Sequence, residues 1–273
     1  ENGLVDEVIR PLMSGKEADV FVVRCGSEIR CAKIYKEAEK RAFKQAVTYQ
    51  EGRKVRNSRR ARAMEKGSKF GREQQEEVWQ SAEVSALFKL ADIGVRVPKP
   101  YGCFDGVLLM ELITYDGEEV APRLNDVTMT EEQALVDHKT LMHDVMRMLC
   151  AGLVHGDLSE FNVLIDDNGP VIIDLPQAVD AAANNNAESM HRRDVENITN
   201  YYAQFAPELS NSHYAPEMWA LFEAGDLHPN TELTGQFEES TESADVDTVL
   251  EEIKQAFIEE QNRLERIQEA ESN

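Results

Sequence analysis

The eight residues His-Gly-Asp-Leu-Ser-Glu-Phe-Asn at 155–162 constrain the fold of this chain more than any other segment. Before them, apolar side chains recur at helical spacing over 135–149, and Gly152 is expected to end that helix. After them, 163–165 and 171–173 are short apolar runs joined by a turn sequence, which predicts a pair of strands. The eight residues are therefore expected to form a loop between a long helix and a hairpin.

Three polar residues in this region have the spacing of a phosphotransferase catalytic site. Asp157 and Asn162 lie five residues apart in the loop, and Asp174 follows the second apolar run. In such a site an Asp orients or deprotonates the attacking hydroxyl, while an Asn and a second carboxylate hold Mg²⁺ between phosphates. Mg²⁺ prefers a few hard oxygen ligands. We expect Asp157 and Asp174 to be catalytic, and Asn162 and Asp174 to bind Mg²⁺ or Mn²⁺.

The first third of the chain is rich in strand patterns and carries the residues expected to bind a nucleotide. Lys33 lies in an alternating strand pattern, where it is expected to pair with the α- and β-phosphates. Its expected partner is Glu83, which belongs to the next helical pattern. In the turn at 14–19, the backbone N–H groups, the Ser14 hydroxyl and the Lys16 ammonium are expected to cover the triphosphate.

These patterns predict an α+β fold with two lobes, because strands dominate the front of the chain and helices the back. We expect a strand-rich N-lobe at 1–112 and a helical C-lobe at 113–235. Beyond them, 236–273 is expected to be a helix with one apolar stripe and acidic residues elsewhere.

The charge of the chain is unevenly distributed. The net charge is −22, which disfavours nucleic-acid binding by the surface as a whole. However, 44–72 contains ten basic and two acidic residues, whereas 232–273 contains thirteen acidic and three basic ones. The basic segment lacks apolar periodicity, so we expect a flexible loop that is a candidate contact for RNA.

Taken together, the motifs resemble those of the RIO family of atypical serine/threonine protein kinases, and its type-one subgroup in particular. The resemblance covers about residues 5–205 and rests on the segments 14–18, 32–36, 155–162 and 172–180. It implies a protein-kinase-like fold, ATP as cofactor, and a hinge at Met110-Glu111-Leu112-Ile113 that meets adenine through Glu111 and Ile113. It also identifies Asp157 with the family's proton acceptor and Asp174 with the aspartate that some members phosphorylate.

The leading interpretation is an ATP- and Mg²⁺-dependent kinase of RIO type that phosphorylates Ser residues on itself or on another protein, or hydrolyses ATP slowly. One alternative is an ATP-gated assembly factor that binds an RNA–protein particle, such as a ribosomal subunit, through 44–72. Another is a small-molecule kinase of the aminoglycoside or choline type, which also uses a His-Gly-Asp loop.

Composition also predicts the cellular compartment of the protein. No run approaches the ~20 consecutive apolar residues that a membrane helix needs, so no membrane association is expected. The four cysteines are scattered, without a CxxC pair, as is typical of thiols in a reducing compartment. We therefore expect a cytoplasmic protein.

Overall fold

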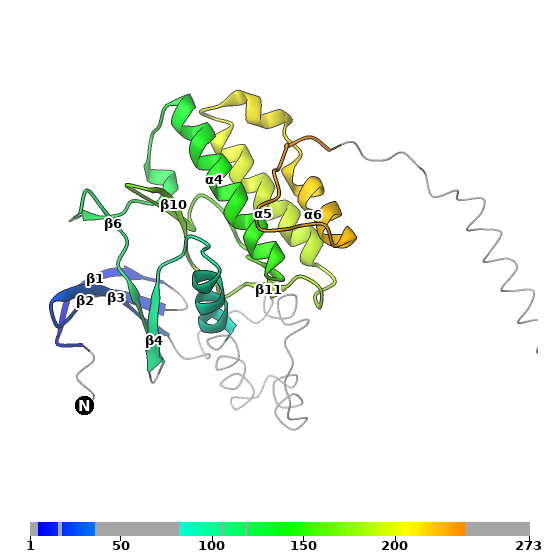
Figure 1. Ribbon diagram of the computed structural model, residues 1–273. Coiled ribbons are helices and arrows are strands. Elements are labelled where there is room, and N and C mark those ends of the chain that lie inside the picture. The colour runs from blue at the N-terminus through cyan, green and yellow to red at the C-terminus, as the bar shows by residue number, and fades with distance from the viewer. Residues whose placement is uncertain (1–4, 16–17, 36–81, 105, 118, 238–273) are drawn as a thin grey trace, which may run out of the picture. The chain divides into compact units, whose positions relative to one another are not determined.

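The computed structural model describes residues 5–15, 18–35, 82–104, 106–117 and 119–237 (Figure 1). Glu1–Gln236 form one compact unit and Phe237–Asn273 another, and every element below belongs to the first. The expected basic loop at 44–72 lies outside the described residues, as does the expected tail helix at 236–273 apart from its first two residues. The expected domain boundaries remain predictions.

The N-terminal part is an antiparallel sheet of five strands in the order β1-β2-β3-β5-β4. The strands are β1 (Glu7–Ser14), β2 (Ala18–Cys25), β3 (Glu28–Tyr35), β4 (Pro100–Phe104) and β5 (Val107–Glu111). Gly26 takes a φ of 62° in the turn between β2 and β3, a conformation that glycine adopts without steric cost. Lys33 pairs with Val20 on one side and Leu108 on the other, so it lies at the centre of the sheet.

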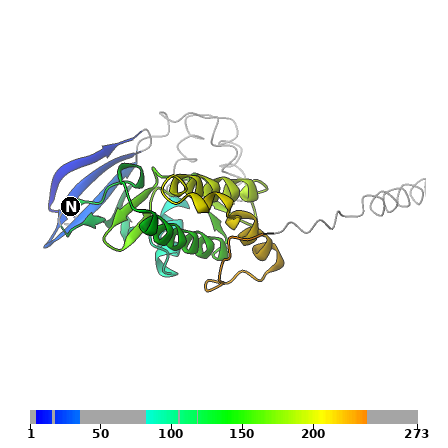
Figure 2. The same ribbon diagram turned by 90° about the horizontal axis from the view of Figure 1, so that it is seen from above.

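The C-terminal part is built on three helices that pack side by side (Figures 1 and 2). They are α4 (Glu131–Cys150), α5 (Ala187–Tyr202) and α6 (Tyr214–Ala224), with short 3₁₀ turns η2 (Leu124–Asp126) and η3 (Pro207–Asn211). The Thr130 hydroxyl caps α4 by accepting from the Gln133 N–H at 3.2 Å. Gly152, with a φ of 72°, follows the end of α4 as expected.

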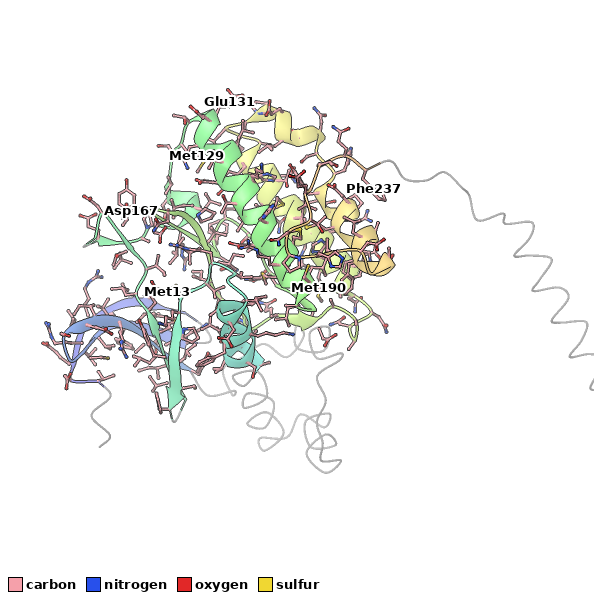
Figure 3. The ribbon with its side chains drawn as sticks, in the orientation of Figure 1. Met13, Met129, Glu131, Asp167, Met190 and Phe237 are labelled. Atoms are coloured by element: carbon pink, nitrogen blue, oxygen red, sulfur yellow. The ribbon has the colours of Figure 1, made fainter. Side chains whose placement is uncertain are left out.

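Three short strand pairs lie outside the five-stranded sheet. They are β6 (Thr114–Tyr115) with β7 (Glu119–Val120), β8 (Leu153–Val154) with β11 (Val179–Asp180), and β9 (Val163–Asp166) with β10 (Gly169–Ile172). Asp167, labelled in Figure 3, lies in the turn between β9 and β10 and accepts the Asp116 N–H. Since β8 pairs with β11, the chain enters and leaves the 155–178 segment at neighbouring points.

The helix at 82–92 belongs to the same apolar core as α4 and α5. Leu90 is fully buried and Leu87 nearly so, in one cluster with side chains of both helices. The Lys89 ammonium donates to the Ala151 carbonyl just beyond α4. Farther along, the Ile172 N–H donates to the Arg96 carbonyl at 2.8 Å, which joins this segment to β10. The helix is therefore fixed against the C-terminal part.

The expected α+β fold, with a strand-rich N-terminal part and a helical C-terminal part, is confirmed. Within the part of the chain that the structure describes, no helix is both long and apolar enough to cross a membrane.

Candidate active site

A cleft of about 660 Å³ separates the underside of the sheet from the 155–178 segment. Apolar side chains form much of its wall, including Val20 from β2, Met110 from β5 and Leu164 from β9. Lys33, Glu83, Asp157, Asn162 and Asp174 also line it. The structure thus brings these five predicted site residues together from segments far apart in the sequence.

Lys33 is the centre of the polar network in the cleft. Its Nζ lies 2.6 Å from Glu83 Oε1 and 2.8 Å from Asp174 Oδ1. Both Lys33 and Glu83 are buried, at 8% and 4% exposure, so neither charge is stabilised by bulk water. Burial disfavours the ammonium, but the two carboxylates outweigh it and raise the pKa of Lys33. The predicted pairing of Lys33 with Glu83 is present.

Asp174 stands at the end of β10 in a conformation that is rare for a residue with a side chain. Its φ is 67°, in the left-handed region, which non-glycine residues occupy at an energetic cost. Burial by itself would raise the pKa of Asp174. Its interactions with the Lys33 ammonium act in the opposite direction, and the net effect is a lowered pKa. Because its side chain is still 43% exposed, the ionised carboxylate remains accessible from the cleft.

Hydrogen bonds of the buried His155 and of Asn162 hold the 155–162 loop in shape. His155 Nε2 donates to the Ile173 carbonyl at 3.0 Å, and its Nδ1 accepts the Asp157 N–H at 3.3 Å. Asn162 Nδ2 donates to the Asp157 carbonyl at 2.8 Å, so its Oδ1 is left as an acceptor. The Ile173 N–H donates to the Asn162 carbonyl at 3.0 Å. Asp157, Asn162 and Asp174 are thus fixed in one frame.

Asp157 is the exposed carboxylate of this loop. Gln177 Nε2 approaches its Oδ2 at 3.4 Å. Partial burial raises the pKa of Asp157 and the charge of Asp174 adds to the rise, while His155 and Arg193 oppose it. A raised pKa makes a carboxylate a better proton acceptor once it is ionised.

Asp194 was not singled out from the sequence, yet its carboxylate binds the backbone of the 155–162 loop. It lies on α5 and is almost fully buried, at 2% exposure. Its two carboxylate oxygens accept the Gly156 N–H at 2.7 Å and the Leu158 N–H at 3.0 Å. Burial raises the pKa of Asp194 to about 6, against the opposing effects of His155, the two amides and Arg193. Nothing local in the sequence distinguishes Asp194 from other acids on helices, so only the tertiary contact reveals it.

The remaining predicted residues divide into three groups. Glu111 and Ile113 line the cleft, and their predicted role at adenine remains a prediction. Ser14 is not among the lining residues, and its hydroxyl donates to Asp19 Oδ1 at 2.5 Å. Lys16 lies outside the described residues.

Comparison with known proteins gives consistent matches. A family model described as RIO domain matches residues 19–215. The RIO-type serine/threonine-protein kinase Rio1 of Haloferax volcanii is 36% identical, over 74% of this chain and 65% of that relative. Rio1 of Methanocaldococcus jannaschii is 32% identical, over 72% of this chain and 63% of the relative. Human serine/threonine-protein kinase RIO1 is 30% identical, over 73% of this chain and 34% of that relative. The chain thus spans less than two thirds of the length of these relatives.

The role of Asp194 is testable by Asp194→Asn. The amide retains one acceptor oxygen but presents an NH₂ group to the second N–H, so one buried donor loses its partner. We expect the free energy of unfolding to fall by about 1–3 kcal/mol. Hydrogen exchange at Gly156 and Leu158 should also accelerate more than exchange elsewhere. The control is Glu196→Gln, an exposed position on the same helix. Equal protection of the two amides in Asp194→Asn and wild type would contradict this role.

Proposed function

The chain belongs to the RIO domain family, and on this premise we propose that it is an ATP- and Mg²⁺-dependent phosphotransferase. It transfers the γ-phosphoryl group to Ser hydroxyls on itself or on another protein, or slowly to water. One observation carries this proposal: the Lys33 ammonium forms ion pairs with both Glu83 and Asp174, in a cleft that Asp157 also lines. That set provides a cation for phosphate, a carboxylate for metal and a proton acceptor.

The cleft offers apolar walls for the base of ATP and a cationic side chain for its phosphates. Apolar side chains such as Val20, Met110 and Leu164 provide walls for a base, and the 111–113 segment provides backbone groups for its edge. Lys33, which also lines the cleft, provides the charge for phosphate oxygens. Glu83 and Asp174 hold the Lys33 ammonium in place, so little side-chain freedom is lost when phosphate binds.

Asn162 and Asp174 would hold the metal ion. They offer an amide oxygen and an ionised carboxylate, the hard ligands that Mg²⁺ prefers. No group of three or more His, Cys, Asp or Glu residues that could hold a metal occurs among the residues described. Phosphate oxygens are therefore needed to complete the coordination shell. When bound, Mg²⁺ would neutralise charge that develops on the phosphates.

Asp157 accepts the proton of the acceptor hydroxyl in this proposal. Its carboxylate is exposed to the cleft, and the bonds of the loop backbone to His155 and Asp194 fix its place. Because its pKa is raised, the Asp157 carboxylate takes a proton more readily than an ordinary aspartate does.

The family match favours a protein kinase over the aminoglycoside- or choline-type alternative. An assembly factor that binds a ribosomal particle through the basic 44–72 segment remains a prediction, because that segment lies outside the described residues. We also propose that the protein works in the cytoplasm, on the pattern of its cysteines.

Asp157→Ala tests the proton acceptor. We expect phosphoryl transfer from γ-labelled ATP to fall by about 10²–10⁴-fold, the usual effect of losing a positioned base. ATP affinity should remain near that of wild type, because Lys33 and the hinge hold the nucleotide. The control is Glu223→Ala, an exposed carboxylate on α6. Transfer within twofold of wild type would refute the assignment.

The metal ligands are tested by titrating Mn²⁺ and following its paramagnetic resonance. We expect tight binding in the presence of a non-hydrolysable ATP analogue and weak binding in its absence, because two protein oxygens alone hold the ion poorly. Asp174→Asn with the same analogue should bind Mn²⁺ more weakly, because one of the two proposed protein ligands loses its charge. Equal Mn²⁺ affinity with and without the analogue would show that the ligands do not share the ion with phosphate.

A further inference from the structure

The cleft contains a second cation that none of the roles above uses. Arg123 lies between β7 and the 3₁₀ turn η2, and it lines the cleft together with Lys33, Asn162 and Asp174. Its backbone forms an antiparallel bridge with Leu164 on β9, and the preceding Pro122 carbonyl accepts the Ile165 N–H at 2.9 Å. The side chain therefore starts from a rigid position beside the strand that follows Asn162.

The guanidinium of Arg123 has a poor partner. Its Nη2 lies 2.8 Å from the Met13 sulfur, across the cleft at the end of β1 (Figure 3 labels Met13). A thioether is only a weak acceptor, whereas a guanidinium has five donors and suits carboxylate or phosphate. Among the residues that the structure describes, Arg123 forms no ion pair.

Acidic side chains outnumber cationic ones among the described residues that line the cleft. Lys33 and Arg123 are the two cationic side chains among its described lining residues. The acidic side chains that line it are Glu83, Glu111, Asp126, Asp157 and Asp174. Because Glu83 and Asp174 already bind Lys33, Arg123 carries the positive charge least committed to a protein carboxylate. A polyanion that enters this cleft is therefore expected to draw on Arg123.

The backbone of Arg123 places this charge near the proposed metal ligands. Its bridge partner Leu164 lies two residues after Asn162. Asn162 and Asp174 line the same cleft as Arg123. A phosphate group that shares a metal ion with Asn162 and Asp174 would therefore enter the part of the cleft that Arg123 also lines.

We propose that Arg123 is a second phosphate-binding cation of this cleft, which exchanges its contact with the Met13 sulfur for phosphate oxygens of the bound nucleotide. The inference rests on the proposed function, since it assumes a nucleoside triphosphate as ligand. Guanidinium binds phosphate through two parallel N–H···O bonds, which would orient the phosphates as well as attract them.

The test is to titrate ATP, ADP and adenosine into the full chain and the Arg123→Gln variant, by calorimetry with Mg²⁺ present. We expect ATP affinity to fall about tenfold or more, as for a lost hydrogen bond to a charged group. Adenosine affinity should stay within twofold of wild type. Arg123→Lys, which keeps the charge but not the paired donors, should give an intermediate ATP affinity.

Two control variants separate this role from others. Met13→Leu removes the sulfur and should leave ATP affinity unchanged or higher, whereas a loss equal to that of Arg123→Gln would indicate a structural clamp and overturn the proposal. Arg10→Gln removes an exposed charge of the same sheet, outside the cleft, and should have no effect.

Other results of these titrations would overturn either the role of Arg123 or the proposed function itself. Unchanged ATP affinity in Arg123→Gln, or equal losses for ATP and adenosine, would overturn phosphate binding by Arg123. If the wild-type chain binds no nucleotide, the proposed function itself fails, and that result is distinct because it appears before any substitution.

Discussion

The buried ammonium of Lys33 is the interaction on which the rest of the site depends. A lysine in this position is stable only with carboxylate partners, and the two it has come from distant segments. Glu83 is 50 residues away in the sequence and Asp174 is 141 residues away. Removing either partner leaves a buried charge poorly compensated, so sheet, helix and loop must meet at one point. The geometry that we propose binds a nucleotide follows from that requirement.

The C-terminal part contributes rigidity to this arrangement. Leu90 packs the helix that carries Glu83 into the same core as α4 and α5. Asp194, on α5, holds the backbone of the 155–162 loop through two amides, and His155 ties that loop to the end of β10. Asp157, the proposed proton acceptor, and Asn162 and Asp174, the proposed metal ligands, are therefore held by one continuous core. The sheet that carries Lys33 closes the cleft from the opposite side.

Local patterns in the sequence were sufficient to predict the α+β fold and the convergence of Lys33, Glu83, Asp157, Asn162 and Asp174. Lys33, Asp157, Asn162 and Asp174 are recognisable because each occupies a place in a short motif or at a strand end, whereas Glu83 was predicted only as an acid on the next helical segment. Asp194 and Arg123 could not be predicted in this way, because their partners come from distant segments and have no sequence spacing to read. The Ser14 hydroxyl donates to Asp19, a local contact that the turn sequence does not reveal, and its expected role at the triphosphate stays a prediction.

The central claim is that Lys33, held by Glu83 and Asp174, organises the nucleotide site. The most direct measurement is ATP affinity in a chain that carries Lys33→Met together with Glu83→Gln, which leaves no buried charge of that pair uncompensated. The unfolding midpoint of the double variant establishes that it is folded. If Lys33 has this role, ATP affinity falls at least about tenfold while the variant remains folded. A folded double variant that binds ATP as tightly as wild type would contradict the claim.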